Sequence, residues 1–356
     1  MRMNLRRTGI AAALIAALLF GLGTPLAKML LEHASPWLLA ALLYLGSGGG
    51  LWVMRMLRGT PGVQLTRQDW GWLAGAIVSG GVCAPVLLMS GLAAMSASGA
   101  ALLLNAEAVF TALLAWFVFR ENFDARIALG MLAIVAGSIV LAWPPDNAVE
   151  IASVWPALAV LAACLAWGLD NNLTRKVALA DASWIAMIKG LSAGASNLVL
   201  ACILGAQWPG TATVMGAALI GFLSYGASLA LFVIALRHLG SARTGAYFSV
   251  APFFGAALSL LLLGEPLTLQ LFAGAALMGL GVALHLSERH EHLHAHAPIE
   301  HAHEHLHGSG DPHHEHVHDN ALDAVAPGQG HSHVHRHQPL KHQHAHFPDS
   351  HHRHEH

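Results

Sequence analysis

Charged side chains are scarce in this chain. They make up 11% of its 356 residues, whereas hydrophobic side chains make up 55%, and the mean hydropathy is +0.54. This composition excludes an ordinary soluble surface. The net charge is −2 with histidine neutral, so there is no basic excess of the kind that binds nucleic acid, and no nucleic-acid partner is expected.

Cysteines and catalytic motifs are also sparse. Cys83, Cys164 and Cys202 each lie inside an apolar stretch, which argues against a disulfide framework and favours small core residues. The GxxxxGK[ST] pattern is missing, so an ATP-driven pump has no support, and neither an HExxH motif nor a convincing Ser/His or paired-Asp constellation is present. We therefore expect no enzyme and no required cofactor.

Ten apolar stretches are present instead. About 20 apolar residues are needed to cross ~30 Å of hydrocarbon as a helix. The basic N-terminus resembles a signal peptide, but its apolar run is longer than a typical one and nine more follow, so we interpret it as an uncleaved first helix. The predicted spans are residues 8–28, 36–56, 70–92, 96–119, 126–143, 153–173, 182–204, 212–235, 243–263 and 268–287.

The last five stretches repeat the first five. Phe110, Glu121 and Gly137 recur 144 positions later, and a block beginning at Ala12 recurs 147 positions later at Ala159. Each unit holds an odd number of spans, so the second copy enters the membrane from the opposite side. The predicted fold is an all-α polytopic membrane protein of ten transmembrane helices in two inverted five-helix repeats, residues 8–145 and 150–288. A disordered His-rich tail over residues 289–356 follows.

Lys and Arg residues fall almost entirely at one set of helix ends. This pattern predicts a multi-pass protein of the inner (plasma) membrane with both termini cytoplasmic. One side carries only Lys28. The other carries Arg2, Arg6, Arg7, Arg55, Arg58, Arg67, Arg120, Arg126, Arg175, Lys176, Arg237 and Arg243.

Two sequence stretches resemble a known family. They are SASGAALLLNAEAVFTALLAWFVFREN and GSARTGAYFSVAPFFGAALSLLLLGEP, and each repeat also opens with an aromatic-glycine pair, Phe20-Gly21 or Trp167-Gly168. Over roughly residues 8 to 288 the chain resembles the ten-span EamA type of the drug/metabolite transporter (DMT) superfamily. Pro252 and Glu265 match the family pattern, whereas the first copy has Glu107-Ala108 where the proline would lie. The resemblance implies secondary transport of small solutes.

Several polar side chains fall inside the predicted spans. Ionisable groups in the bilayer are costly and usually face a cavity or a partner. Glu107, with Thr111 one turn away, is predicted to couple protons or bind a cation; the alternative is a protonated, purely structural glutamate. Lys189 could pair with Glu107 or Asp170, or its ammonium could reach the interface. Asn171 joins the candidate substrate or coupling residues.

Residues 170–172 (Asp-Asn-Asn) correspond to residues 23–25 (Gly-Thr-Pro) of the first repeat. Matched polar or proline-containing segments in two repeats predict matched helix breaks at a binding site. The alternative is simple helix termination, because Asp and Asn favour caps and turns.

Two tyrosines and two glutamates lie within the predicted spans or at their ends. Tyr225 and Tyr247 could line a cavity, although such residues more often hold membrane helices together. Glu121 and Glu265 lie at helix ends and are predicted to cap positively polarised helix N-termini.

The tail is dominated by histidine. From His290 to the C-terminus, 23 of 67 residues are His. Few large apolar residues interrupt them, so no packed core is expected. Neutral imidazole suits divalent Ni, Co, Zn or Cu, and the tail is predicted to bind several such ions. The predicted ligands are His290, His292, His294, His296, His301, His303, His305, His307, His313, His314, His316, His318, His331, His333, His335 and His337.

Together these features predict a secondary transporter that works by alternating access, with export as the favoured direction. Divalent metal cations are slightly favoured as cargo because of the tail. The first alternative is an exporter of a small organic metabolite or drug whose tail only buffers or senses metal. The second, from another class, is a membrane-anchored metal store or sensor without transport. The expected partners are a small-molecule or metal-ion substrate and the lipid bilayer, and a homodimer stays open.

Overall fold

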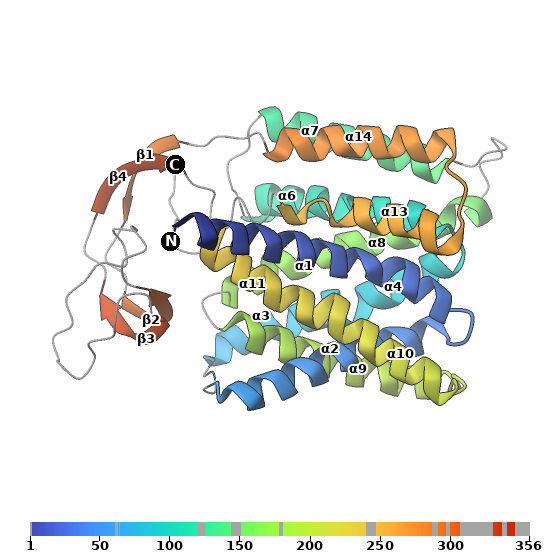
Figure 1. Cartoon of the computed structure of the whole chain (residues 1–356), viewed down its shortest axis with the longest axis horizontal. Helices are drawn as coiled ribbons and strands as arrows, with labels where there is room; N and C mark the ends of the chain where they lie inside the picture. The colour runs from blue at the N-terminus through green and yellow to red at the C-terminus, as the bar shows by residue number, and fades with distance from the viewer. Residues whose placement is uncertain are drawn as a thin grey trace. The chain divides into compact units, whose positions relative to one another are not determined.

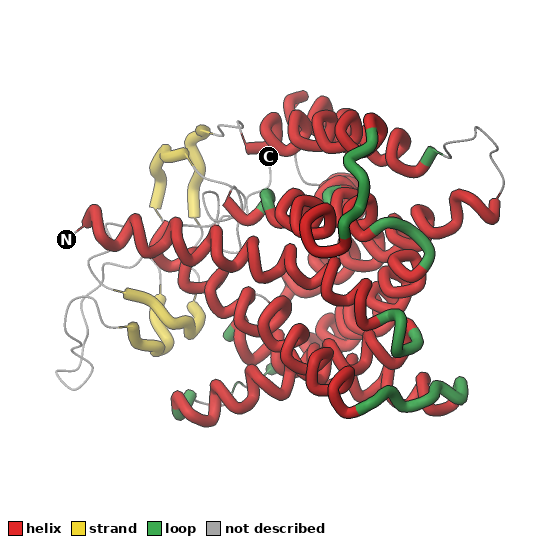
Figure 2. Tube along the Cα trace, turned by 45° about the vertical axis from the view of Figure 1, so that its right-hand side comes forward, coloured by secondary structure: helices red, strands yellow, loops and turns green. Residues whose placement is uncertain are grey.

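The computed structural model describes residues 2–60, 63, 65–119, 125–143, 151–177, 181–239, 247–286, 291–296, 300–306, 330–336 and 340–345. The chain divides into two compact units, Met1–Glu288 and Arg289–His356. In the described part of the first unit, only helices and short loops occur, and the strands lie in the second unit (Figure 2). The predicted all-α membrane architecture is confirmed.

Seven helical stretches are long and apolar enough to cross a membrane, and three shorter apolar helices occupy the other predicted spans. The helices of the first repeat are α1 (Arg2–Leu30), α2 (Pro36–Arg58), α3 (Arg67–Ala76), the π-helix η1 (Ile77–Cys83), α4 (Ala84–Ala93), α5 (Ala97–Leu103), α6 (Ala106–Phe119) and α7 (Ala125–Ala142). Those of the second are α8 (Ile151–Thr174), the 3₁₀ turn η2 (Arg175–Val177), α9 (Ala182–Ile203), α10 (Thr211–Gly221), the π-helix η3 (Phe222–Ala227), α11 (Ser228–Leu239), α13 (Ala251–Leu263) and α14 (Leu269–Leu286).

The helix irregularities come in matched pairs. The π-helices η1 and η3 start 145 positions apart. The turn at Leu104 and Asn105 divides span 4 into α5 and α6, and the turn at Ser249 and Val250, again 145 positions later, precedes α13. Interrupted helices at equivalent places in two inverted repeats mark the substrate region of secondary carriers.

The breaks predicted in spans 1 and 6 do not form. Helix α1 continues through Pro25, and α8 continues through residues 170–172. A proline is tolerated in a membrane helix because neighbouring groups satisfy the backbone carbonyl that it frees. In α8, Asn172 stays helical because its side-chain amide donates to the Gly168 carbonyl one turn earlier (2.8 Å).

Glycines bring the two repeats into close contact. Helices α2 and α9 pack together, as do α7 and α14, along opposite sides of the first unit in Figure 1. A Cβ added to Gly190 would lie 2.8 Å from the Cα of Gly48, and one added to Gly137 would lie 3.0 Å from the Gly274 carbonyl oxygen. Small residues allow this close backbone approach, which supplies much of the packing energy between membrane helices.

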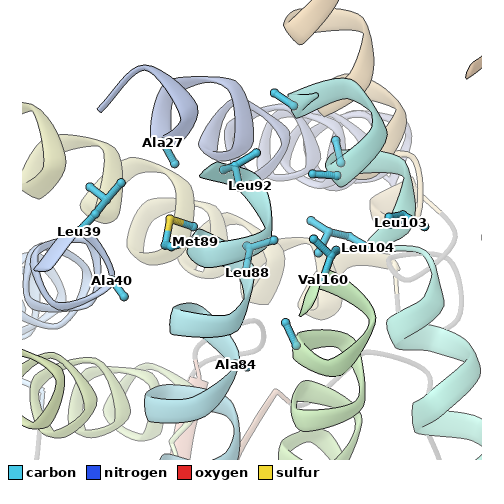
Figure 3. Packing of buried hydrophobic residues seen from close by; sticks show 14 of the residues in the cluster. Ala27, Leu39, Ala40, Ala84, Leu88, Met89, Leu92, Leu103, Leu104 and Val160 are labelled. Atoms are coloured by element: carbon cyan, nitrogen blue, oxygen red, sulfur yellow. The ribbon is translucent and has the colours of Figure 1, made fainter. Parts of the chain in front are cut away.

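The largest buried cluster joins helices of both repeats (Figure 3). Ala27 of α1, Leu39 of α2, Met89 of α4, Leu103 of α5 and Val160 of α8 are all nearly or fully buried. This core holds α5 against α8, the helix that carries several of the polar residues described below.

Four strands lie in the second unit, where the sequence predicts disorder. β1 (Glu291–His296) pairs antiparallel with β4 (Leu340–Ala345), and β2 (Glu300–Leu306) pairs antiparallel with β3 (Gly330–Arg336). The expectation of disorder is corrected for these segments. The strands form where His alternates with other residues, because a period of two suits a strand.

Candidate functional site: a polar cluster at the break in span 4

A buried ion pair links α8 to α9. The ammonium of Lys189 donates to both carboxylate oxygens of Asp170, at 2.5 and 2.7 Å, and to the Thr174 hydroxyl at 3.2 Å. Asp170 is 5% exposed. Of the options open for Lys189, the structure shows pairing with Asp170, which neutralises both charges away from water.

A second group of hydrogen bonds ties α8 to the start of α6. The side-chain amide of Asn171 donates to a Glu107 carboxylate oxygen (2.8 Å) and to the Thr111 hydroxyl (3.2 Å). That of Asn172 donates to the Thr111 carbonyl (3.1 Å). Glu107 lies in the first turn of α6, directly after the break at Leu104 and Asn105. The structure thus brings Glu107, Thr111 and Asn171 together.

The π-helix η1 supports the ion pair from a third side. Its Gly80 carbonyl accepts hydrogen bonds from the Tyr44 hydroxyl (3.0 Å) and the Trp167 indole N–H (2.9 Å). A Cβ at Gly80 would collide with the carboxyl group of Asp170. A π-helix shifts the backbone bonding register, so this carbonyl is available to side chains from α2 and α8.

Aromatic rings continue the cluster into the second repeat. Tyr225 of η3 has its ring centroid 5.8 Å from that of Phe20 and 5.8 Å from that of Tyr44. Tyr225 therefore lies beside the polar cluster. Tyr247 instead packs against Ala12 and Ala235, which favours the helix-packing interpretation for that residue.

Asn171 of the cluster is exposed on the side of α8 opposite to its exposed leucines. Leu158, Leu165 and Leu169 are exposed and form one stripe along α8, the side expected to face lipid. Asn171 lies two turns after the buried Cys164, on the opposite stripe, yet Asn171 is exposed. Its exposure therefore opens toward the interior of the bundle.

The residues on the two sides of the break in span 4 differ in exposure. We call the end of the bundle at which α1 finishes the Lys28 end. The opposite end, at which α2 finishes, is the Arg55 end. On the Lys28 side of the break, every residue of α5 is buried. On the Arg55 side, Glu107 and Thr111 of α6 are partly exposed. The polar cluster thus lies at the transition from the fully buried α5 to the partly exposed start of α6.

Sequence reasoning assigned no role at the site to Tyr44, Gly80 or Trp167, although it matched Trp167 with Phe20 as a feature of the repeat. Tyr44 also carried a usable signal, because it stands 145 positions before Lys189. Superposing the repeats residue by residue would have marked it. The Gly80 carbonyl carried no such signal, because a π-helix cannot be recognised from this composition.

Metal-ligating side chains do not gather in the described part of the chain, which holds no group of three or more His, Cys, Asp or Glu suited to a metal ion. Nine of the predicted tail ligands lie in the strands: His292, His294, His296, His301, His303, His305, His331, His333 and His335. His290, His307, His313, His314, His316, His318 and His337 lie outside the described residues, as does Glu121.

The chain matches the EamA-like transporter family twice, over residues 7–143 and 154–287. It belongs to the EamA-like transporter family. An uncharacterized transporter of Methanothermobacter thermautotrophicus is 27% identical over 293 residues, which cover 78% of this chain and 85% of that protein. A solved crystal structure that is 20% identical covers 77% of this chain and 95% of its own, with a TM-score of 0.59, and so shares the fold. This EamA-like protein is a membrane transporter of small solutes and not an enzyme.

Proposed function

We propose that this EamA-like transporter moves its solute by alternating access, with export as the favoured direction, and that Glu107 binds a cationic group or a coupling proton. The observation that carries the proposal is the position of Glu107. It follows a helix break, bonds to Asn171, and is partly exposed, whereas every residue of α5 before the break is buried. Carboxylates in such positions within the bilayer usually belong to the transport pathway.

The charges of the cluster support competition between proton and cargo. Asp170 is already held by Lys189 through both oxygens, so Glu107 carries the carboxylate that is left without a cation. A proton or a cationic solute can each neutralise it. If only one of them binds at a time, proton entry drives solute release, which is the basis of an antiporter.

The site favours an organic cargo with a positively charged group over a bare metal ion. Glu107, Asn171 and Thr111 offer a single free carboxylate with an amide and a hydroxyl. Transition metals prefer several imidazole, thiolate or carboxylate ligands. The rings of Tyr44, Tyr225 and Phe20 add apolar and cation–π surface nearby.

Divalent metal remains the second candidate cargo, on the basis of the tail. A His-rich segment next to the membrane would raise the local metal concentration at one mouth of the carrier. In the organic-cargo proposal, the same tail buffers or senses Ni, Co, Zn or Cu. A metal store without transport is the weaker proposal, because an anchor needs neither paired helix breaks nor a polar cluster between repeats.

The cargo is identified by measuring how much of each candidate solute accumulates in cells. The cells produce the intact protein, the Glu107→Gln variant or a shortened chain that ends at Ser287. Nickel, cobalt, zinc and a panel of monoamines, polyamines and quaternary ammonium ions are supplied and quantified by mass spectrometry. We expect lower accumulation of an organic cation with the intact and the shortened protein, but not with Glu107→Gln. A lower metal content of the cells that depends on Glu107 would overturn the proposal of an organic cargo. Glu32→Gln, which removes an exposed carboxylate outside the cluster, is the control.

The predicted location is the inner membrane with both termini cytoplasmic, which makes the Arg55 end the cytoplasmic end. The distribution of basic residues supports this proposal. That orientation would put the partly exposed Glu107 and Thr111 on the cytoplasmic side of the break in span 4, where an exporter collects its cargo.

A further inference from the structure

The turn between α4 and α5, residues 94–96, is held by a cation from a different helix. The ammonium of Lys28, in the last turn of α1, donates to the carbonyls of Leu92 (2.7 Å), Ala93 (3.1 Å) and Met95 (2.9 Å). These carbonyls belong to the C-terminal end of α4 and the turn itself, where the helix dipole favours a positive charge. All three donor positions of the ammonium are used.

An anion from the other repeat holds the second side of the same turn. Glu265, in the loop between α13 and α14, accepts hydrogen bonds from the backbone N–H groups of Ala97 (2.6 Å) and Ser98 (2.9 Å). The sequence predicted that Glu265 caps a helix N-terminus. The helix that it caps is α5 of the first repeat rather than the following helix, α14.

Toward α13, α5 packs through small residues, whereas its Leu102 and Leu103 belong to the large buried cluster. A Cβ added to Gly255 of α13 would lie 2.9 Å from the Cβ of Ala101 in α5. One added to Gly21 of α1 would lie 2.8 Å from the Gly255 nitrogen. Surfaces of glycine and alanine present no interlocking side chains, so they can part by a rigid shift. The two bonds of Glu265 must break if α5 leaves the α13–α14 loop, and the three bonds of Lys28 must break if the turn before α5 and the end of α4 leave α1.

We propose that Lys28 and Glu265 form a clamp that keeps the Lys28 end closed, and that opening toward this end requires its release. They are positioning residues: they act on α5, which covers the polar cluster, and not on the solute. The inference rests on the alternating access proposed above. Charge-assisted hydrogen bonds are stronger than neutral ones, so the clamp biases the resting transporter toward the state seen here.

The sequence keeps the same residue types at the inverted positions. Arg175 stands 147 positions after Lys28, and Glu121 stands 144 positions before Glu265. Neither side chain is among those described, and the proposal concerns the Lys28–Glu265 clamp only.

The clamp is tested by thiol accessibility without any substrate. Cys83, Cys164 and Cys202 are replaced by alanine, and Ser98→Cys, a nearly isosteric change at a buried residue, introduces a reporter in α5. A sulfonated, membrane-impermeant maleimide is added to intact cells and, separately, to inverted vesicles. Breaking charge-assisted bonds should shift the equilibrium by about tenfold or more. We therefore expect Lys28→Met and Glu265→Gln to accelerate labelling about tenfold from the Lys28 end, and Lys28→Arg to restore part of the slow rate.

Glu32→Gln is the matched control. Glu32 is an exposed acid at the same end that acts on Lys28 only through its charge. Unchanged labelling in the two clamp variants, or equal acceleration in Glu32→Gln, would overturn the clamp. Faster labelling from both ends at once would also overturn it, because that is the signature of a loosened fold. Glu107→Gln should abolish transport yet leave the labelling rate slow, so a wrong transport site and a wrong clamp give different results.

Discussion

Tyr44 and Lys189 occupy equivalent positions in the two repeats, 145 residues apart, and reach the same cluster from the paired helices α2 and α9. The Tyr44 hydroxyl donates to the Gly80 carbonyl at 3.0 Å, whereas the Lys189 ammonium donates to the Asp170 carboxylate. Gly80 and Asp170 are themselves in contact. The inverted repeat therefore builds one asymmetric site, in which an ion pair from the second repeat rests against a backbone carbonyl from the first.

Removing Lys189 should destabilise the protein strongly. Lys189→Met leaves the Asp170 carboxylate buried without its cation, and breaking a buried pair typically costs about 3–5 kcal/mol. The thermal unfolding midpoint in detergent should fall. Replacing both partners, as Lys189→Met with Asp170→Leu, should recover a large part of the loss. A single variant as stable as the parent would show that the pair is not formed in the membrane.

Gly80 should tolerate no side chain. Gly80→Ala places a Cβ against the Asp170 carboxyl group, so the ion pair or η1 must shift, and overpacking of this kind costs about 1–3 kcal/mol. We expect reduced transport and a lower unfolding midpoint. Gly49→Ala is the matched control, since a Cβ there meets nothing within 4 Å. Equal behaviour of the two variants would contradict the contact.

The contact between Arg55 and Asp181 should make the Arg55 end sensitive to acid. Arg55 donates to Asp181 at 2.8 Å, and Ser183 and the Trp184 amide N–H donate to the same carboxylate. Burial alone would raise the pKa of Asp181, but the bonds from Ser183, Trp184 and Arg55 together lower it. Because the folded pKa lies below the unfolded one, this stabilisation is present above the unfolded pKa and is lost as the pH falls through the folded pKa.

Asp181→Asn tests this sign. Below roughly pH 4, where an ordinary aspartate becomes protonated, the parent should lose protection of the α9 N-terminus in hydrogen exchange. The variant should be less protected near neutral pH and change little on acidification. The effect should be modest, because Asp181 is 36% exposed and solvent screens the pair. If the parent and Asp181→Asn lost protection to the same extent on acidification, Asp181 would not be the source of the acid sensitivity.

The sequence predicted the bundle well and the site in part. Hydropathy and the repeat predicted the spans, because burial in lipid demands long apolar helices. The positions of the breaks were wrong: residues 23–25 and 170–172 stay helical. The breaks form instead at Leu104, which no proline follows, and at Ser249, just before α13 with Pro252 in its first turn. Placing Lys189 against Asp170 and not Glu107 required the relative rotation of α8 and α9. The orientation of α9 also depends on its packing against α2, where Gly48 and Gly190 approach closely, and it cannot be deduced from a single helix.

Glu107 is the residue on which the account depends most. Purified protein in liposomes, loaded with the organic cation identified by the accumulation assay, should release it when an opposing pH gradient is imposed. Glu107→Asp should retain part of this coupled flux, with its pH dependence shifted. Glu107→Gln should lose the pH dependence entirely while keeping its fold by thermal unfolding. Undiminished proton-driven flux in a folded Glu107→Gln would contradict the central claim that this carboxylate binds the cation or the coupling proton.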